Sequence, residues 1–240
     1  MKRTERHHLK ENELQTLAVQ ARDLFDTRRR EANIIGAILL AVIVIGGGYF
    51  LWQERVQARA SAMLAQAIAV QESRVSTPGT AASPGTAGAY PTERARLQAA
   101  VAKFKSAADT YPSTDAGVFA RYQEAVGQVA LGNPASAVSA YQEVIKRSGG
   151  IYGQMARLGL AEAQARAGQY DQAINAFKEL AQRKDGPLPI DGILMQLGRA
   201  YRDAGKRADA QQTFNRLVDE YPESPFMAEA KRELDTLNKT

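Results

Sequence analysis

Residues 168–183 read GQYDQAINAFKELAQR, and residues 132–147 read GNPASAVSAYQEVIKR. The two stretches align without a gap, with glycine at the first position, alanine at the sixth and an aromatic residue at the tenth. Residues 205–220, GKRADAQQTFNRLVDE, repeat these three positions, and residues 95–110, ARLQAAVAKFKSAADT, repeat the alanine and the aromatic residue. An internal repeat of 36 or 37 residues therefore organises this part of the chain.

The repeated unit is predicted to be a pair of helices joined by a glycine turn. Gly132, Gly168 and Gly205 each follow a run of helix-forming residues, and glycine readily adopts the left-handed conformation that ends a helix. A proline after Tyr111 and after Tyr221 ends the second helix of the first and last units. We expect a half unit that lacks its leading helix over 92–111, three full units over 115–147, 151–183 and 190–221, and a capping helix over 224–238.

Small residues are predicted to let the two helices of each unit approach, with an aromatic side chain between them. The small residues are Ala125, Ala161 and Gly198 on the first helices and Ala137, Ala173 and Ala210 on the second, and the aromatic residues are Tyr141, Phe177 and Phe214. This pattern resembles the tetratricopeptide repeat, although the period exceeds the usual 34 residues and Gly149 and Asp185 replace the closing proline of the middle units. The resemblance implies an α-solenoid whose groove binds other proteins.

Residues 34–52 are nineteen residues without a charge. A helix of that length spans about 28 Å, close to the thickness of the hydrocarbon core, so a single transmembrane helix is predicted in an all-α protein. Arg28, Arg29 and Arg30 precede it, which places the N-terminus in the cytoplasm and residues 53–240 outside. A cleaved signal peptide would need a charged leader of 33 residues, so we predict an uncleaved anchor.

The remaining segments complete the predicted domain organisation. Residues 1–33 form a cytoplasmic leader with an amphipathic helix, on which Leu14, Leu17 and Leu24 share one face. Residues 53–74 are rich in helix formers and are expected to continue the membrane helix as a stalk. Residues 75–91, with three prolines, three glycines and no charge, are expected to be a flexible linker that lets the repeat domain of 92–240 search near the membrane.

The sequence shows no converging set of catalytic or metal-binding residues. The chain has no cysteine, and its two histidines, His7 and His8, lie in the leader. The net charge of +5 divides into +2 for residues 1–33 and +3 for residues 53–240, too evenly for a nucleic-acid surface. We predict no enzymatic activity, no cofactor, no metal site and no nucleic-acid partner.

A protein-binding groove is expected along the first helices of the units, because these line the inner surface of a helical-repeat array. Counting along each helix from its small residue places on this face Phe119, Tyr122, Met155, Leu158, Glu162, Arg166, Met195, Arg199 and Arg202. Apolar anchors here would hold an amphipathic or extended segment, with Arg199 and Arg202 meeting its acidic groups. The competing interpretation is structural: Leu158 and Met195 pack between repeats, and the arginines form a solvated face.

The combination of cytoplasmic leader, single anchor and external repeats is similar to the bacterial family of the ancillary SecYEG translocon subunit, whose repeat domain is shared with the cell division coordinator CpoB. Residues 213–234, TFNRLVDEYPESPFMAEAKREL, also resemble repeats in outer-membrane assembly lipoproteins. The resemblance implies an inner-membrane protein with a periplasmic repeat domain, which binds the translocon through its anchor and holds chaperones or emerging chains with its repeats. The alternative is a homo-oligomer, associating through residues 37–74, that organises the cell envelope or division machinery.

Overall fold

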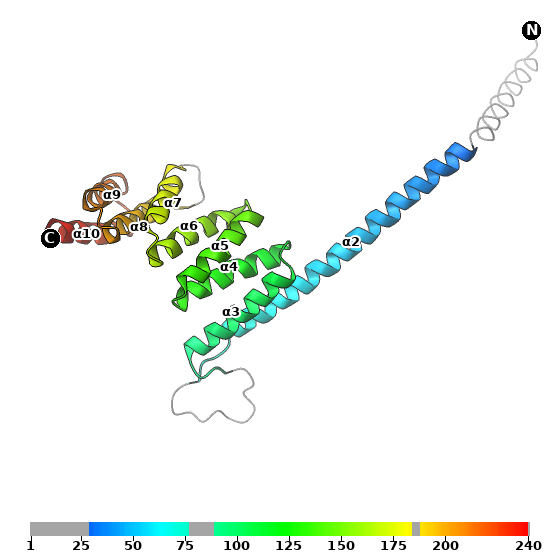
Figure 1. The fold of residues 1–240 in the computed structure, drawn as a ribbon, viewed down its shortest axis with the longest axis horizontal. Coiled ribbons are helices and arrows are strands. Elements are labelled where there is room, and N and C mark those ends of the chain that lie inside the picture. Colours follow the sequence, from blue (N-terminus) through cyan, green and yellow to red (C-terminus); the bar gives the residue numbers. More distant parts are fainter. Residues whose placement is uncertain (1–28, 77–88, 184–187, 240) are drawn as a thin grey trace, which may run out of the picture. The chain divides into compact units, whose positions relative to one another are not determined.

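The computed structural model describes residues 29–76, 89–183 and 188–239, and every regular element in these ranges is a helix (Figure 1). The helices are α2 (Arg29–Gln71), α3 (Glu93–Thr110), α4 (Asp115–Ala130), α5 (Pro134–Arg147), α6 (Ile151–Arg166), α7 (Tyr170–Gln182), α8 (Ile190–Asp203), α9 (Arg207–Glu220) and α10 (Met227–Lys239). The predicted all-α fold is confirmed. The predicted amphipathic helix of the leader, His7 and His8 lie outside the described residues.

The chain divides into two compact units, residues 1–55 and 56–240. The first contains the apolar part of α2, whose large apolar side chains between Ile34 and Trp52 are all exposed. By length and composition, α2 is the one helix among the described residues that could cross a membrane. Exposed apolar surface of this kind is better accommodated by lipid than by water.

The helix pairs of the second unit are joined by the same turn three times. Gly132, Gly168 and Gly205 have positive φ angles of 82°, 76° and 74°. In each turn the residue after the glycine donates its backbone N–H to the carbonyl five residues earlier, at 2.8 Å. This bond satisfies a carbonyl that the ending helix leaves free. The turn thus sends each second helix back along its first helix.

The core between paired helices is built from the small and aromatic residues of the repeat. Ala125 and Ala161 on the first helices and Ala137, Ala173 and Ala210 on the second are fully buried, and the rings of Tyr141, Phe177 and Phe214 are buried with them. At Gly198 the approach is so close that a Cβ atom would lie 2.4 Å from the ring of Phe214. Gly159 faces Tyr141 at the same distance, so glycine also permits contact between neighbouring units.

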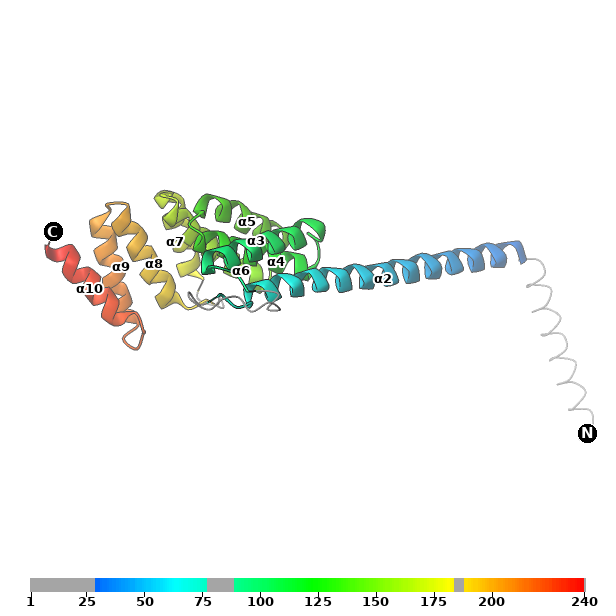
Figure 2. The same cartoon turned by 90° about the horizontal axis from the view of Figure 1, so that it is seen from below.

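The beginning of the repeat domain differs from the sequence prediction. We expected residues 53–74 to form a separate stalk and the first unit to lack its leading helix. In the structure the last turns of α2 lie alongside α3 (Figures 1 and 2), and the compact unit begins at residue 56. Ala67 is fully buried in one apolar cluster with Ala100 and Phe104. Residues 56–71 therefore supply the leading helix that the first unit was expected to lack.

The Pro/Gly-rich segment is consequently an insertion within the first helix pair. Residues 77–88 lie outside the described residues, but the residues on either side are held together. The backbone N–H of Ser76 donates to the carbonyl of Tyr90 at 2.8 Å, and the N–H of Tyr90 donates to the carbonyl of Arg74 at 2.9 Å. The guanidinium of Arg96 on α3 donates to the carbonyl of Ser73 at 3.1 Å. These bonds close the insertion at its base, so its length does not separate α2 from α3.

A buried charge network joins the first helix pair to the second. The side chain of Arg121 on α4 is 10% exposed and pairs with Asp109 on α3 and with Glu124 one turn away. Its Nε also lies 3.1 Å from a carboxylate oxygen of Glu143 on α5. Burial raises the pKa of Glu124, and the charge of Arg121 opposes this rise. One guanidinium thus links three helices.

Candidate protein-binding surface on the inner face

The first helices of successive pairs lie closer together than the second helices. Among the described residues, α4 contacts α6 and α6 contacts α8, whereas α5 and α7, or α7 and α9, make no contact of comparable extent. The array therefore curves with α4, α6 and α8 on its inside. We call the surface of these three helices the inner face, and the surface of α5, α7 and α9 the outer face.

Three aromatic side chains cluster on the inner face. Phe119 and Tyr122 come from α4 and Tyr152 from α6, and all three are half-buried. The ring centroids of Phe119 and Tyr152 are 5.3 Å apart, and those of Tyr122 and Tyr152 are 6.4 Å apart. Tyr122 also meets Tyr141 of the core edge to face at 5.8 Å. The cluster is anchored by the core, and its exposed part offers rings and hydroxyl groups to a partner.

A charged group lies beside this cluster. Burial raises the pKa of Glu162, while the charges of Arg166 and Arg199 oppose the rise. Burial and the charge of Glu162 also raise the pKa of Tyr122, one of the three clustered rings. Arg166 is exposed and makes no ion pair with any described residue. The centre of the inner face therefore combines apolar rings with a half-buried acid, Glu162, and an exposed cation, Arg166.

Two arginines predicted for the groove have partners within the chain. Arg199 pairs with Glu229, and Arg202 pairs with Glu233, both carboxylates belonging to α10. We expected these arginines to pair with the acidic groups of a bound segment. In the structure the acidic side chains of the capping helix α10 pair with them instead. The helix supplies carboxylates four residues apart, which places them on one face opposite the arginines of α8. The predicted basic end of the groove is thus neutralised.

The other predicted groove residues divide between surface and core. Met195 has no exposed surface, so its assignment to the groove is wrong: it packs in the core shared by α7, α8 and α9. Leu158 is half-buried and packs against the same core, and Met155 is half-buried. Sequence reasoning missed Tyr152. It lies three residues before Met155 and so on the same helical face, a spacing that would have identified it.

The described residues contain no group of three or more histidine, cysteine, aspartate or glutamate side chains placed to hold a metal ion. The arrangement on the inner face is one of rings, a carboxylate and a guanidinium without a nucleophile paired to a base. Such a surface can bind a polypeptide through apolar contact, hydrogen bonds and ion pairing. These side chains on the inner face are therefore suited to binding another protein.

Comparison with known proteins agrees with this geometry. Tetratricopeptide-repeat models match residues 122–187 and residues 193–224. Two crystal structures of a Podospora anserina protein described as a kinesin light chain with nearly identical TPR-like repeats share the fold. They have TM-scores of 0.57 and 0.56, are 15% and 16% identical, and cover 76% of this chain and 86% and 87% of their own. No curated protein sequence matches the chain.

The extent of the structural likeness bears on the first helix pair. Residues 92–240 make up less than 76% of the chain, so the likeness includes residues before 92. This agrees with α2 as the leading helix of the first pair. Residues 122–187 and 193–224 therefore match tetratricopeptide repeats, and the helix pairs build a TPR-like solenoid, a fold that supports protein–protein interaction.

Proposed function

We propose that this protein is a membrane-anchored scaffold that holds a segment of a partner protein on the inner face of its repeats. The observation that carries the proposal is the half-exposed cluster of Phe119, Tyr122 and Tyr152 beside Glu162 and Arg166. Aromatic and arginine side chains dominate the binding energy of protein interfaces when they lie at the centre of a contact. This is the part of the inner face where both kinds of side chain are available.

The chemistry of the surface suggests what the partner presents. Apolar side chains of an extended or amphipathic segment would pack on the rings of Phe119 and Tyr152. A basic group in the segment would pair with Glu162, and an acidic group would pair with Arg166. Because Glu162 is half-buried, partner binding that removes more water from it is favourable only when the basic group is in place. The surface would therefore prefer segments that carry a basic and an acidic residue in the matching order, in addition to apolar side chains.

We further propose that residues 34–52 anchor the protein in an inner membrane, with the N-terminus in the cytoplasm and the repeats in the periplasm. The exposed apolar side chains of α2 and the three arginines before them support this orientation. The membrane partner would be a protein-translocation complex, as the resemblance to the translocon-subunit family implies. The repeats would then hold chaperones or emerging chains beside that complex.

Photo-crosslinking in cells tests the proposal. A photoreactive residue replaces Tyr122, Tyr152 or Ala41, and a matched probe replaces Arg207, which is exposed on the outer face. We expect Tyr122 and Tyr152 to capture soluble proteins or nascent chains, Ala41 to capture a translocon subunit, and Arg207 to capture neither. Phe119→Ala should reduce the Tyr122 adducts at least tenfold, because it removes a neighbouring anchor.

The same experiment separates the alternative function. If Ala41 captures a second copy of this chain alone, and the inner-face probes yield no more adducts than Arg207, the protein is a self-associating organiser of the envelope and the scaffold proposal is wrong. Equal capture by Tyr122 and Arg207 would also contradict it, because binding would not depend on the inner face.

A further inference from the structure

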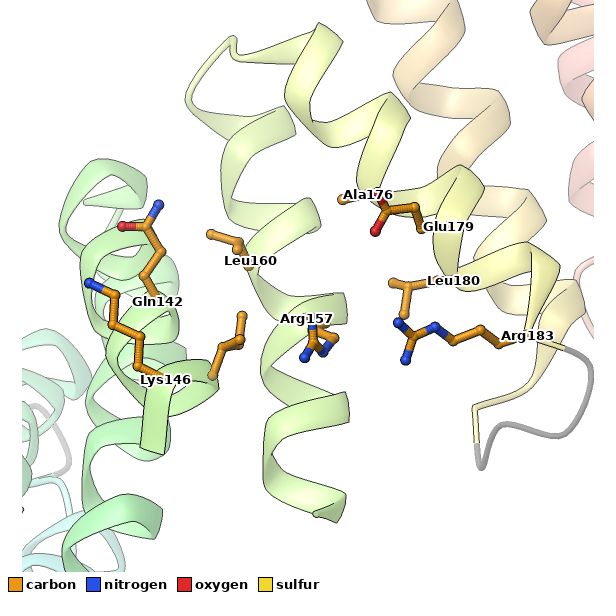
Figure 3. Close-up of a pocket in the computed structure, with 9 residues that line it drawn as sticks. Gln142, Lys146, Arg157, Leu160, Ala176, Glu179, Leu180 and Arg183 are labelled. Carbon is orange, nitrogen blue, oxygen red and sulfur yellow. The ribbon is translucent and has the colours of Figure 1, made fainter. Parts of the chain in front are cut away.

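A cavity of about 490 Å³ opens on the outer face, opposite the surface proposed to hold a partner (Figure 3). It lies between α5 and α7, with α6 as its floor. Its lining residues are Gln142, Ile145, Lys146, Arg157, Leu160, Ala176, Glu179, Leu180 and Arg183. Nothing in the repeat pattern pointed to this site.

The curvature of the array accounts for the cavity. Because the first helices approach one another on the inner face, the second helices α5 and α7 separate on the outer face. Two separate apolar clusters also meet at α6. Ala156 and Ala163 of this helix belong to the cluster around α5, and Ala161 belongs to the cluster around α7. The cavity lies at this boundary between the two clusters, where one side of α6 is left uncovered.

The charges of the cavity are unbalanced. Lys146, Arg157 and Arg183 line it, and none of them forms an ion pair within the part of the chain that the structure describes. Glu179 is the one carboxylate among the nine lining residues. Arg183, directly after the end of α7, extends toward the side of the cavity where Arg157 of α6 lies (Figure 3). Cationic groups that line one cavity repel one another, and an anion bound there relieves that repulsion.

The floor of the cavity is apolar. Leu160 from α6, Ile145 from α5 and Leu180 from α7 line the cavity together with the cationic groups. Leu160 and Ile145 are half-buried, so each leaves apolar surface open to solvent. A ligand that brings only negative charge leaves this surface wet, whereas one that also brings an apolar group covers it.

We propose that this cavity is a second protein-binding site, which takes an acidic polypeptide segment with a large aliphatic side chain next to its carboxylates. The aliphatic side chain enters over Leu160, and the carboxylates pair with Arg157, Arg183 and Lys146. The apolar floor favours a peptide over an anionic lipid headgroup or free phosphate, since either of these uses the cations alone. The site lies on the opposite face from the proposed partner groove and does not depend on it.

The test uses the full chain in phosphatidylcholine nanodiscs and a fluorescent peptide in which two leucines are flanked by glutamates. Fluorescence anisotropy should show saturable binding. The variant R157Q/R183Q should weaken binding at least tenfold, and a peptide with serine for leucine should bind at least tenfold more weakly than the leucine peptide. The matched control R94Q/R207Q removes two arginines that are exposed and without an ion pair in the described ranges, and it should change binding less than twofold.

Leu160→Ala provides a second test that does not alter charge. We expect this variant to weaken binding of the leucine peptide severalfold and to leave binding of the serine peptide unchanged. Circular dichroism verifies that each variant is folded. Equal weakening by R157Q/R183Q and R94Q/R207Q would overturn the proposal, because binding would follow net charge. Displacement by millimolar phosphate, or by phosphatidylglycerol vesicles with no preference for leucine, would also overturn it in favour of an anion or headgroup site. Loss of binding in Phe119→Ala alone would assign the peptide to the inner face.

Discussion

The first helix pair, α2 with α3, and the last, α8 with α9, have similar cores and different connections. In each, a buried small residue of the leading helix lies against an aromatic ring of the second helix: Ala67 shares an apolar cluster with Phe104, and Gly198 lies directly against the ring of Phe214. The last pair turns through one glycine, whereas the first pair is joined by a long Pro/Gly-rich insertion. Packing therefore defines a helix pair in this protein, and the connection between its helices is free to vary.

Replacing Arg121 by methionine should produce the largest loss of stability. It leaves Glu124 buried and unpaired at the boundary of the first pair, which costs about 3–5 kcal/mol. The matched change at the other end of the array, Arg199→Met, breaks a pair whose side chains are 31% and 36% exposed and should cost less than about 1 kcal/mol. Urea unfolding of the full chain in detergent, followed by circular dichroism, measures both.

The loss in Arg121→Met should depend on pH. Burial already raises the pKa of Glu124, and without the guanidinium the folded-state pKa rises further. The folded chain then holds this proton more tightly than the unfolded chain, so the loss is complete above the raised pKa and fades as the pH falls through it. A loss that does not change between neutral and acidic pH would assign the effect to packing.

Ala67→Leu tests whether the end of α2 belongs to the repeat core. Three extra carbons at a fully buried position should cost about 1–3 kcal/mol, whereas Ala65→Leu, at an exposed position of the same helix, should cost little. Hydrogen exchange of the full chain should show faster exchange in α3 for the first variant alone. Equal exchange in the two variants would mean that α2 is a separate stalk, as the sequence had suggested.

Gly205→Ala tests the turn of the last pair. The left-handed backbone at this residue, with φ of 74°, costs a residue with a side chain about 1 kcal/mol or more. No atom lies within 4 Å of the position that its Cβ would take, so the loss comes from the backbone and not from a clash. The free energy of unfolding should then fall by a similar amount in Gly168→Ala. A large difference between the Gly205→Ala and Gly168→Ala variants would contradict a turn conformation shared by the two pairs.

Shortening the insertion of the first pair should have the smallest effect. Removing residues 80–85 shortens a closed loop, and loop-closure entropy changes by only about 0.6 kcal/mol for each halving. We therefore expect a slight gain in stability, below that value, and unchanged hydrogen exchange in α3. A loss of several kcal/mol would show that the insertion carries packing of its own.

Sequence reasoning was strong where a residue's role is local. Glycine at a helix end, alanine at a close approach and an aromatic ring four residues later are positions that backbone conformation and volume restrict, so they recur at fixed spacing. The helix pairs from α4 to α9 could be recognised by these marks. The pair formed by α2 and α3 could not, because its connection lacks the glycine turn and its leading helix continues from the apolar stretch.

The functional surface was harder to predict, because exposure depends on residues distant in sequence. Met195 has the spacing of a groove residue, but it lies in the core that α8 shares with α7 and α9. Arg199 and Arg202 lie on the expected face, and their availability depends on α10, some thirty residues later. The outer cavity depends on how far α5 and α7 separate, and no single helix encodes that distance.

The three identical glycine turns also bear on how such a chain can grow. Because each turn fixes the next helix by bonds within a few residues of itself, a unit carries its own geometry and needs only a neighbour's surface to pack on. A gene segment of 36 or 37 codons, copied in frame at a turn, would add one step to the array and leave its ends unchanged. The length of the repeat array would then change in whole units. However many units there are, α10 would cover the apolar surface of the last one.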